Sequence, residues 1–140
     1  LVGGDVYFSA EPVRKNLLGH WDILQQEHYS RPALPPVTGE APLPESPSEV
    51  SVAAAESGGN QLSIEGDPYA RGHAVYRISG AAGETPDPCA LADGTHLVAV
   101  LGEGETTWED PEGESSDTYV VTAVNSQNQE GEPSTPATRP

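Results

Sequence analysis

The stretch Asp117-Thr-Tyr-Val-Val-Thr-Ala-Val-Asn125 decides the fold of this chain. Its side chains alternate with a period of two, which places Tyr119, Val121 and Ala123 on one face of an extended segment. The alternate residues, which are also mostly apolar, lie on the other face. The stretch therefore predicts one strand close to the C-terminus.

Further β signals extend over residues 48–140. Short alternating or apolar runs predict strands at 50–54, 62–64, 73–78, 97–101, 106–109 and 134–138. Turn residues separate these runs, and no helical period lies between them. Short strands at such spacings predict an all-β sandwich. The segment 79–94, with two prolines, is long for a hairpin loop.

The first 34 residues follow a different pattern. Asp5–Ser9 is an apolar strand, and Pro12 suits the first turn of a helix. Apolar residues at spacings of three and four predict that helix, with a break at Gly19: Val13, Leu17, Trp21, Leu24 and His28. One strand and one helix cannot bury a core alone. We therefore interpret residues 1–34 as the terminal βα segment of a larger domain, in a chain whose lack of Met indicates a fragment of a longer protein.

Residues 35–47 form a proline-rich connector between these two parts. Six prolines lie in and beside it: Pro32, Pro35, Pro36, Pro42, Pro44 and Pro47. Such a segment is extended and has no core of its own. It predicts a domain boundary, with a β-sandwich at 48–140.

The charge of the chain excludes two classes of partner. It carries 22 acidic and 6 basic residues, a formal net charge of −16. This surface repels phosphate backbones and anionic lipids, so we expect neither nucleic-acid binding nor membrane insertion. The acid excess fits a halophilic protein, and it fits ordinary solubility of a secreted protein equally well.

Four short motifs of the β half occur in a recognisable order. They are Leu62-x-Ile64 followed by Asp67-Pro68, Val75-Tyr76-Arg77, Trp108-x-Asp110, and Tyr119-x-Val121-x-Ala123-x-Asn125. Together they make residues 47–138 resemble a fibronectin type III domain, an immunoglobulin-like sandwich.

That resemblance implies structural roles for three residues. Tyr119 would form the tyrosine corner, in which its hydroxyl bonds back to the backbone. Trp108 would take an inward aromatic position, and Ile64 stands where many members have tryptophan. Such domains are usually spacers or binding modules rather than enzymes.

The N-terminal part carries a second set of motifs. They are Gly4, Tyr7-Phe8-Ser9, Lys15-Asn16, Gly19, Asp22, Tyr29 and Pro32-Ala33-Leu34-Pro35. In order and spacing they resemble the C-terminal end of a bacterial glycosyl-hydrolase-like family related to family 10 glycoside hydrolases. The resemblance implies that residues 1–34 are the remnant of a (β/α)₈ barrel acting on glycans, with its catalytic residues upstream. It also implies a bacterial protein of the cell envelope or exterior, whose own barrel domain is the sandwich's partner.

No residue pattern predicts a catalytic, cofactor or metal site. Glu11 is best explained as a first-turn acid that complements the helix dipole. Four histidines lack metal-ligand spacing: His20, His28, His73 and His96. We expect His73 to be a partly buried structural residue. Cys89 is the single cysteine, so it forms no intramolecular disulfide, and no basic neighbour activates its thiol.

Two binding hypotheses remain open. The acidic stretch within 103–114 either holds calcium or is a solvated loop, and it lacks the EF-hand pattern. A carbohydrate-binding face needs exposed aromatic rings. Trp108 and Tyr119 are assigned to the core, so Tyr69 and Tyr76 are the candidate carbohydrate contacts.

Overall fold

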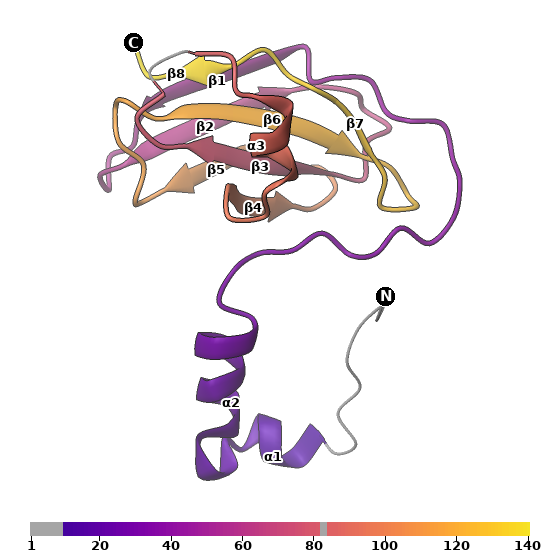
Figure 1. Ribbon diagram of the computed structural model, residues 1–140, viewed down its shortest axis with the longest axis vertical. Helices are drawn as coiled ribbons and strands as arrows, with labels where there is room; N and C mark the ends of the chain where they lie inside the picture. The colour runs from indigo at the N-terminus through magenta and orange to yellow at the C-terminus, as the bar shows by residue number, and fades with distance from the viewer. Residues whose placement is uncertain (1–9, 82–83) are drawn as a thin grey trace. The chain divides into compact units, whose positions relative to one another are not determined.

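The computed structural model describes residues 10–81 and 84–140, in two compact units, 1–32 and 33–140 (Figure 1). The described residues of the first unit are mostly helical, and the second unit is built mainly of strands. The strand predicted at Asp5–Ser9 lies outside the described residues.

The second unit contains two antiparallel sheets, whose strand arrows are labelled in Figure 1. One sheet has the order β1-β2-β5, formed by β1 (Glu49–Ala54), β2 (Asn60–Glu65) and β5 (Thr107–Asp110). The other has the order β4-β3-β6-β7, with β8 also paired to β6. Its strands are β3 (Gly72–Ile78), β4 (Leu97–Leu101), β6 (Thr118–Val124), β7 (Glu130–Pro133) and β8 (Ala137–Thr138). The predicted all-β sandwich is confirmed.

The core lies where the two sheets face each other. In β2, burial alternates residue by residue, so Leu62 and Ile64 point inward. In β6 every residue is buried, as expected for a strand flanked by β3 on one side and by β7 and β8 on the other. The main core cluster consists of Val52, Leu62, Ile64, Val75, Ala99, Leu101, Tyr119 and Val121. Trp108 is partly buried and packs against it.

Two elements of this unit differ from the sequence prediction. A short helix, α3 (Pro88–Ala92), lies in the predicted long loop 79–94 and begins where the Asp87 side chain accepts a hydrogen bond from the Cys89 amide. Strand β7 has the polar sequence Glu-Gly-Glu-Pro, which contains no apolar alternation. It is a strand because it pairs with β6, not because of its own residues.

The first unit is a broken helix. It consists of α1 (Ala10–Arg14), the 3₁₀ turn η1 (Leu17–Gly19), α2 (His20–Ile23) and its π-helical continuation η2 (Leu24–His28). The break occurs because Asn16, Leu18 and Gly19 have left-handed φ values of 48°, 56° and 73°. The Asn16 side chain then accepts a hydrogen bond from the Trp21 amide at 2.8 Å and stabilises the start of α2. The predicted break at Gly19 is confirmed.

The connector 35–47 contains neither helix nor strand. It belongs to the same compact unit as the sandwich, and several of its backbone groups hydrogen bond to that sandwich.

Candidate functional site

A buried ionic cluster lies at one end of the sandwich. We use this name for Arg77, Asp110, Asp117, Tyr119 and Asn60, which come from β2, β3, the end of β5 and the start of β6. Arg77 Nη1 lies 2.8 Å from Asp110 Oδ2, and Arg77 Nε lies 3.9 Å from Asp117 Oδ2. The Tyr119 hydroxyl donates to Asp110 Oδ2 at 2.9 Å and accepts from Asn60 Nδ2 at 3.0 Å.

The electrostatics of the cluster indicate a structural role. Burial raises the pKa of Tyr119 to about 12, and the Asp110 carboxylate adds to this effect. Burial alone would lower the pKa of Arg77, but the carboxylates of Asp110 and Asp117 outweigh it and raise that pKa. Each buried carboxylate is paired with a cation and with backbone amides, so neither is left to act as an acid or a base.

This geometry corrects two expectations. Tyr119 is fully buried, but its hydroxyl donates to a carboxylate rather than to the backbone acceptor of a tyrosine corner. Asp110 was grouped with a solvated or calcium-binding acidic stretch, yet it is buried against Arg77. Residue spacing along the chain gives no sign of this partner, because Arg77 is on a different strand and in the other sheet.

A polar hollow of about 370 Å³ lies elsewhere on the sandwich. It is lined by Glu45, Ser46, Ser48, Gly66, Asp67, Pro68 and Tyr69. The ring of Tyr69 is 87% exposed. Asp67 Oδ1 accepts a hydrogen bond from the Tyr69 amide at 2.8 Å, which fixes the turn that presents this ring.

Tyr76 does not join this hollow. It is only 5% exposed, and its hydroxyl donates to Glu130 Oε1 at 2.6 Å. Burial, together with that carboxylate, raises the pKa of Tyr76. The prediction that Tyr76 is an exposed carbohydrate contact is wrong, because Leu34 and Leu91 pack against the cluster that contains it.

The histidines and the cysteine form no metal site within the part of the chain that the structure describes. Residues 10–81 and 84–140 contain no group of three or more metal-ligating side chains. His73 is buried, and neither of its ring nitrogens has a hydrogen-bond partner among the described residues. Burial lowers the pKa of His73. Cys89 is exposed.

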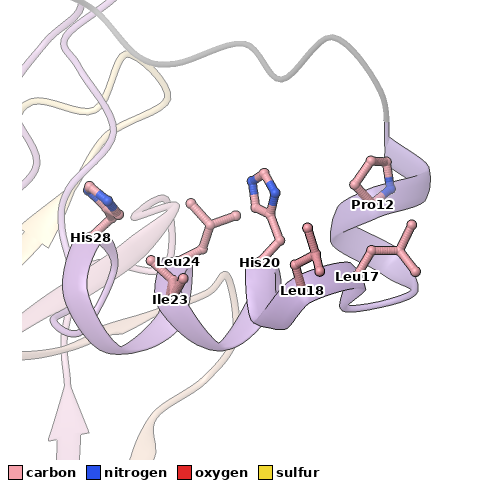
Figure 2. Close-up of a pocket in the computed structure, with 7 residues that line it drawn as sticks. All are labelled: Pro12, Leu17, Leu18, His20, Ile23, Leu24 and His28. Carbon is pink, nitrogen blue, oxygen red and sulfur yellow. The ribbon is translucent and has the colours of Figure 1, made fainter.

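The helical unit carries an apolar hollow of about 490 Å³ (Figure 2). It is lined by Pro12, Leu17, Leu18, His20, Ile23, Leu24 and His28. Figure 2 shows His20, Leu24 and His28 rising from one side of the helix, one turn apart. Leu18 is fully exposed. Its backbone is also left-handed, a conformation that is unfavourable for leucine. Of the predicted stripe, Leu17, Leu24 and His28 line this hollow, whereas Val13 and Trp21 do not. The period missed Leu18 and Ile23.

No family model matches this chain, and no curated protein matches it. Among solved structures, a Fn3-like protein from Clostridium thermocellum is 21% identical, with a TM-score of 0.52 over 71% of this chain and 94% of that one. The third fibronectin III domain of a human protein is 16% identical, with a TM-score of 0.43 over 71% of this chain and 85% of that one. A beta-1,2-glucanase from Parabacteroides distasonis is 18% identical, with a TM-score of 0.45 over 76% of this chain and 14% of that one.

The first of these similarities shows the fold. The strand order of the two sheets and the likeness to the Fn3-like protein define the second unit as a fibronectin type III-like β-sandwich. In the described ranges, no helix is both long and apolar enough to cross a membrane.

Proposed function

We propose that this chain is the non-catalytic C-terminal part of a glycoside-hydrolase-like protein, in which the sandwich is an accessory module for spacing or for protein contact. The exposed apolar face of the helical unit is the observation that carries this proposal. We also propose that the protein is bacterial and works in the cell envelope or outside the cell.

The helical unit supports the proposal because its described residues expose several large apolar side chains. Leu17, Leu18, Trp21 and Ile23 are all exposed in a unit made of very short helices. Helices this short are not stable in water unless a packed partner covers their apolar face. The upstream barrel domain, which the motifs of residues 1–34 resemble at its C-terminal end, is the partner we infer.

The sandwich supports a non-catalytic role because its inward carboxylates are already paired. Glycoside hydrolysis needs two carboxyl groups that face each other across a substrate cleft. The buried Asp110 and Asp117 are paired with Arg77. The partly exposed Asp67 accepts hydrogen bonds from the amides of Tyr69 and Glu45. Any catalytic pair would belong to the upstream barrel.

Two proteins test this proposal. One is the present chain, and the other is the same chain extended by the upstream barrel domain that the proposal requires. We expect the longer chain to hydrolyse a glycan from a broad substrate panel and the present chain to hydrolyse none. Turnover of any glycan by the present chain, at a rate that Asp67→Asn abolishes, would overturn the proposal.

Carbohydrate binding is a second candidate function, favoured by the polar hollow beside Tyr69. An exposed aromatic ring next to carboxylate and hydroxyl groups can stack on a sugar and accept its hydroxyl hydrogens. Glu45 and Asp67 favour a neutral glycan over a uronic acid, because the whole chain is strongly acidic. Tyr69→Ala should abolish retention on an insoluble neutral polysaccharide, while Val100→Ala, which alters another exposed site, should leave it unchanged.

A further inference from the structure

The connector is held on the sandwich by a loop rich in amide side chains. We call residues 34–47 the strap and Asn125–Gln129, between β6 and β7, the amide loop. Thr38 donates its backbone N–H to the carbonyl of Gln127 at 3.1 Å and its hydroxyl to Gln127 Oε1 at 2.9 Å. The Ala41 amide donates to Gln129 Oε1 at 3.1 Å.

The amide loop also donates hydrogen bonds to the strap. Asn128 Nδ2 donates to the Pro36 carbonyl at 3.0 Å, and Asn125 Nδ2 donates to the Pro42 carbonyl at 3.1 Å. An extended proline-rich segment makes no internal hydrogen bonds, so its carbonyl groups are open to such donors. The amide loop therefore provides the chemistry that this kind of peptide requires.

Both ends of the strap are anchored as well. Leu34 packs against the apolar cluster of Ala74, Tyr76, Leu97 and Val124. Near the other end, the Ser46 hydroxyl donates to the Pro133 carbonyl at 3.0 Å. Between these points the strap passes so close to β7 that a Cβ on Gly131 would lie 2.3 Å from the Pro44 carbonyl oxygen.

The amide loop has contacts of its own that shape it. Asn125 Oδ1 accepts hydrogen bonds from the amides of Gln127 and Gln129 at 2.9 and 3.0 Å. Asn128 has a left-handed φ of 63°, which asparagine tolerates better than most residues. These contacts lie within the loop and contribute to its shape independently of the bonds to the strap.

We propose that the amide loop is a receptor for an extended proline-rich peptide and that the chain's own strap occupies it. The sandwich and its connector then move as one body rather than as a domain on a flexible linker. The inference does not depend on the proposed function, because every contact lies within residues 33–140.

The first test replaces the side-chain amides of Asn125 and Asn128, which donate hydrogen bonds to the strap, by carboxylates of the same shape, which can only accept. Asn125→Asp keeps the oxygen that accepts from the Gln127 and Gln129 amides, and Asn128→Asp keeps the preference for a left-handed backbone. Each loses its donor and faces a strap carbonyl with a carboxylate. Asn125→Asp also loses the Nδ2 hydrogen bond to Gln129 Oε1, so the Gln127 and Gln129 amides must keep their protection for the result to report on the strap. Amide exchange measured by NMR on the full chain should show Thr38 and Ala41 protected in the natural protein. In the double variant their exchange should accelerate about tenfold or more, with the β6 amides unchanged.

The matched control makes the same chemical change elsewhere. Gln25→Glu with Gln61→Glu converts two amides into carboxylates at exposed positions outside the loop, one on η2 and one on β2, and so controls for the added charge alone. We expect protection of Thr38 and Ala41 to be retained in this control. Equal loss in the control, or unchanged protection in the loop variant, would overturn the role of the amide loop.

A second test displaces the strap by volume alone. Gly131→Ala places a methyl group against the Pro44 carbonyl, whereas Gly94→Ala adds one where no atom lies within 4 Å. Exchange at Ala41 should accelerate only in Gly131→Ala.

Both measurements are repeated over a range of protein concentrations with light scattering. Unprotected strap amides in the natural chain would overturn the proposal, and so would protection that appears only in a dimer, because the strap would then belong to a second copy.

Discussion

At the scale of single residues, Arg77 is the cation on which the end of the sandwich depends. It is largely buried and contacts both Asp110 and Asp117, whose side chains are about as inaccessible as the core. Arg77→Met would leave two buried carboxylates without a cation, which typically costs about 3–5 kcal/mol. We expect a large fall in the urea midpoint of unfolding.

The control for this prediction is Arg71, which directly precedes β3, the strand that contains Arg77. Arg71 pairs with Glu103 at the surface, where both side chains are mostly exposed. Exposed ion pairs contribute at most about 1 kcal/mol, so Arg71→Met should change the midpoint little. Similar midpoints for the two variants would contradict the account of the buried ionic cluster.

His73 should make stability depend on pH. Burial holds its folded-state pKa below the ordinary value of 6.5, so the unfolded chain binds a proton more readily than the folded one. The contribution of His73 is therefore complete above pH 6.5 and is lost progressively as the pH falls below that value. The free energy of unfolding should decline as the pH falls below 6.5, and less steeply in His73→Gln. Parallel pH profiles for the two proteins would show that His73 is not the titrating group.

At the scale of elements, the β1–β2 turn depends on two glycines with different demands. Gly58 and Gly59 both have left-handed backbones, at φ values of 94° and 83°. A Cβ on Gly58 would meet no atom within 4 Å, whereas one on Gly59 would lie 2.1 Å from the Asp110 carbonyl oxygen. The turn therefore approaches the end of β5 at Gly59 only.

Alanine scanning of this turn should separate backbone strain from collision. Gly58→Ala should cost about 1–2 kcal/mol from the left-handed conformation alone. Gly59→Ala should cost about 1–3 kcal/mol more, because the end of β5 must move. Thermal or urea unfolding measures the loss of stability in each variant. Equal losses would indicate that the end of β5 moves away from the added methyl group at no energetic cost.

Sequence patterns predicted those elements whose own residues carry the signal. The strand containing Tyr119 and Val121 alternates clearly, and it is β6. The strand Glu130–Pro133 has no such pattern and forms through its neighbour. The strand of Tyr76 was predicted correctly, but its side chain is buried rather than exposed. Leu34, assigned to the N-terminal βα segment, and Leu91, assigned to a long loop, pack against the cluster that contains it.

The candidate sites were less predictable than the fold, for a physical reason. The buried ionic cluster joins residues that are 33 and 40 positions apart in sequence, and no local spacing marks such a pair. The amide loop could not be predicted as a binding site from the sequence, because Asn and Gln side chains occur in many surface loops and turns that bind nothing. Tyr69 became a candidate by elimination, because Trp108 and Tyr119 were assigned to the core, and it is exposed.

At the scale of the whole molecule, the charge of −16 should govern the response to salt. Six basic residues cannot neutralise 22 acidic ones, so the folded surface repels itself. Salt screens these exposed charges, while the buried Arg77 pairs are screened much less. The melting temperature should therefore rise from low to molar sodium chloride. A fall would mean that surface attraction outweighs repulsion.

The most direct test of the central claim concerns Trp21, which is 45% exposed on the helical unit. If an upstream domain covers this face, Trp21 becomes inaccessible when that domain is present. The comparison uses Trp108→Phe in both the present chain and the longer chain, with any upstream tryptophans also replaced, so that Trp21 is the only indole. We predict that acrylamide quenches Trp21 strongly in the present chain and severalfold less in the longer one, with emission shifted to the blue. Equal quenching in both proteins would contradict the claim that this unit completes an upstream domain.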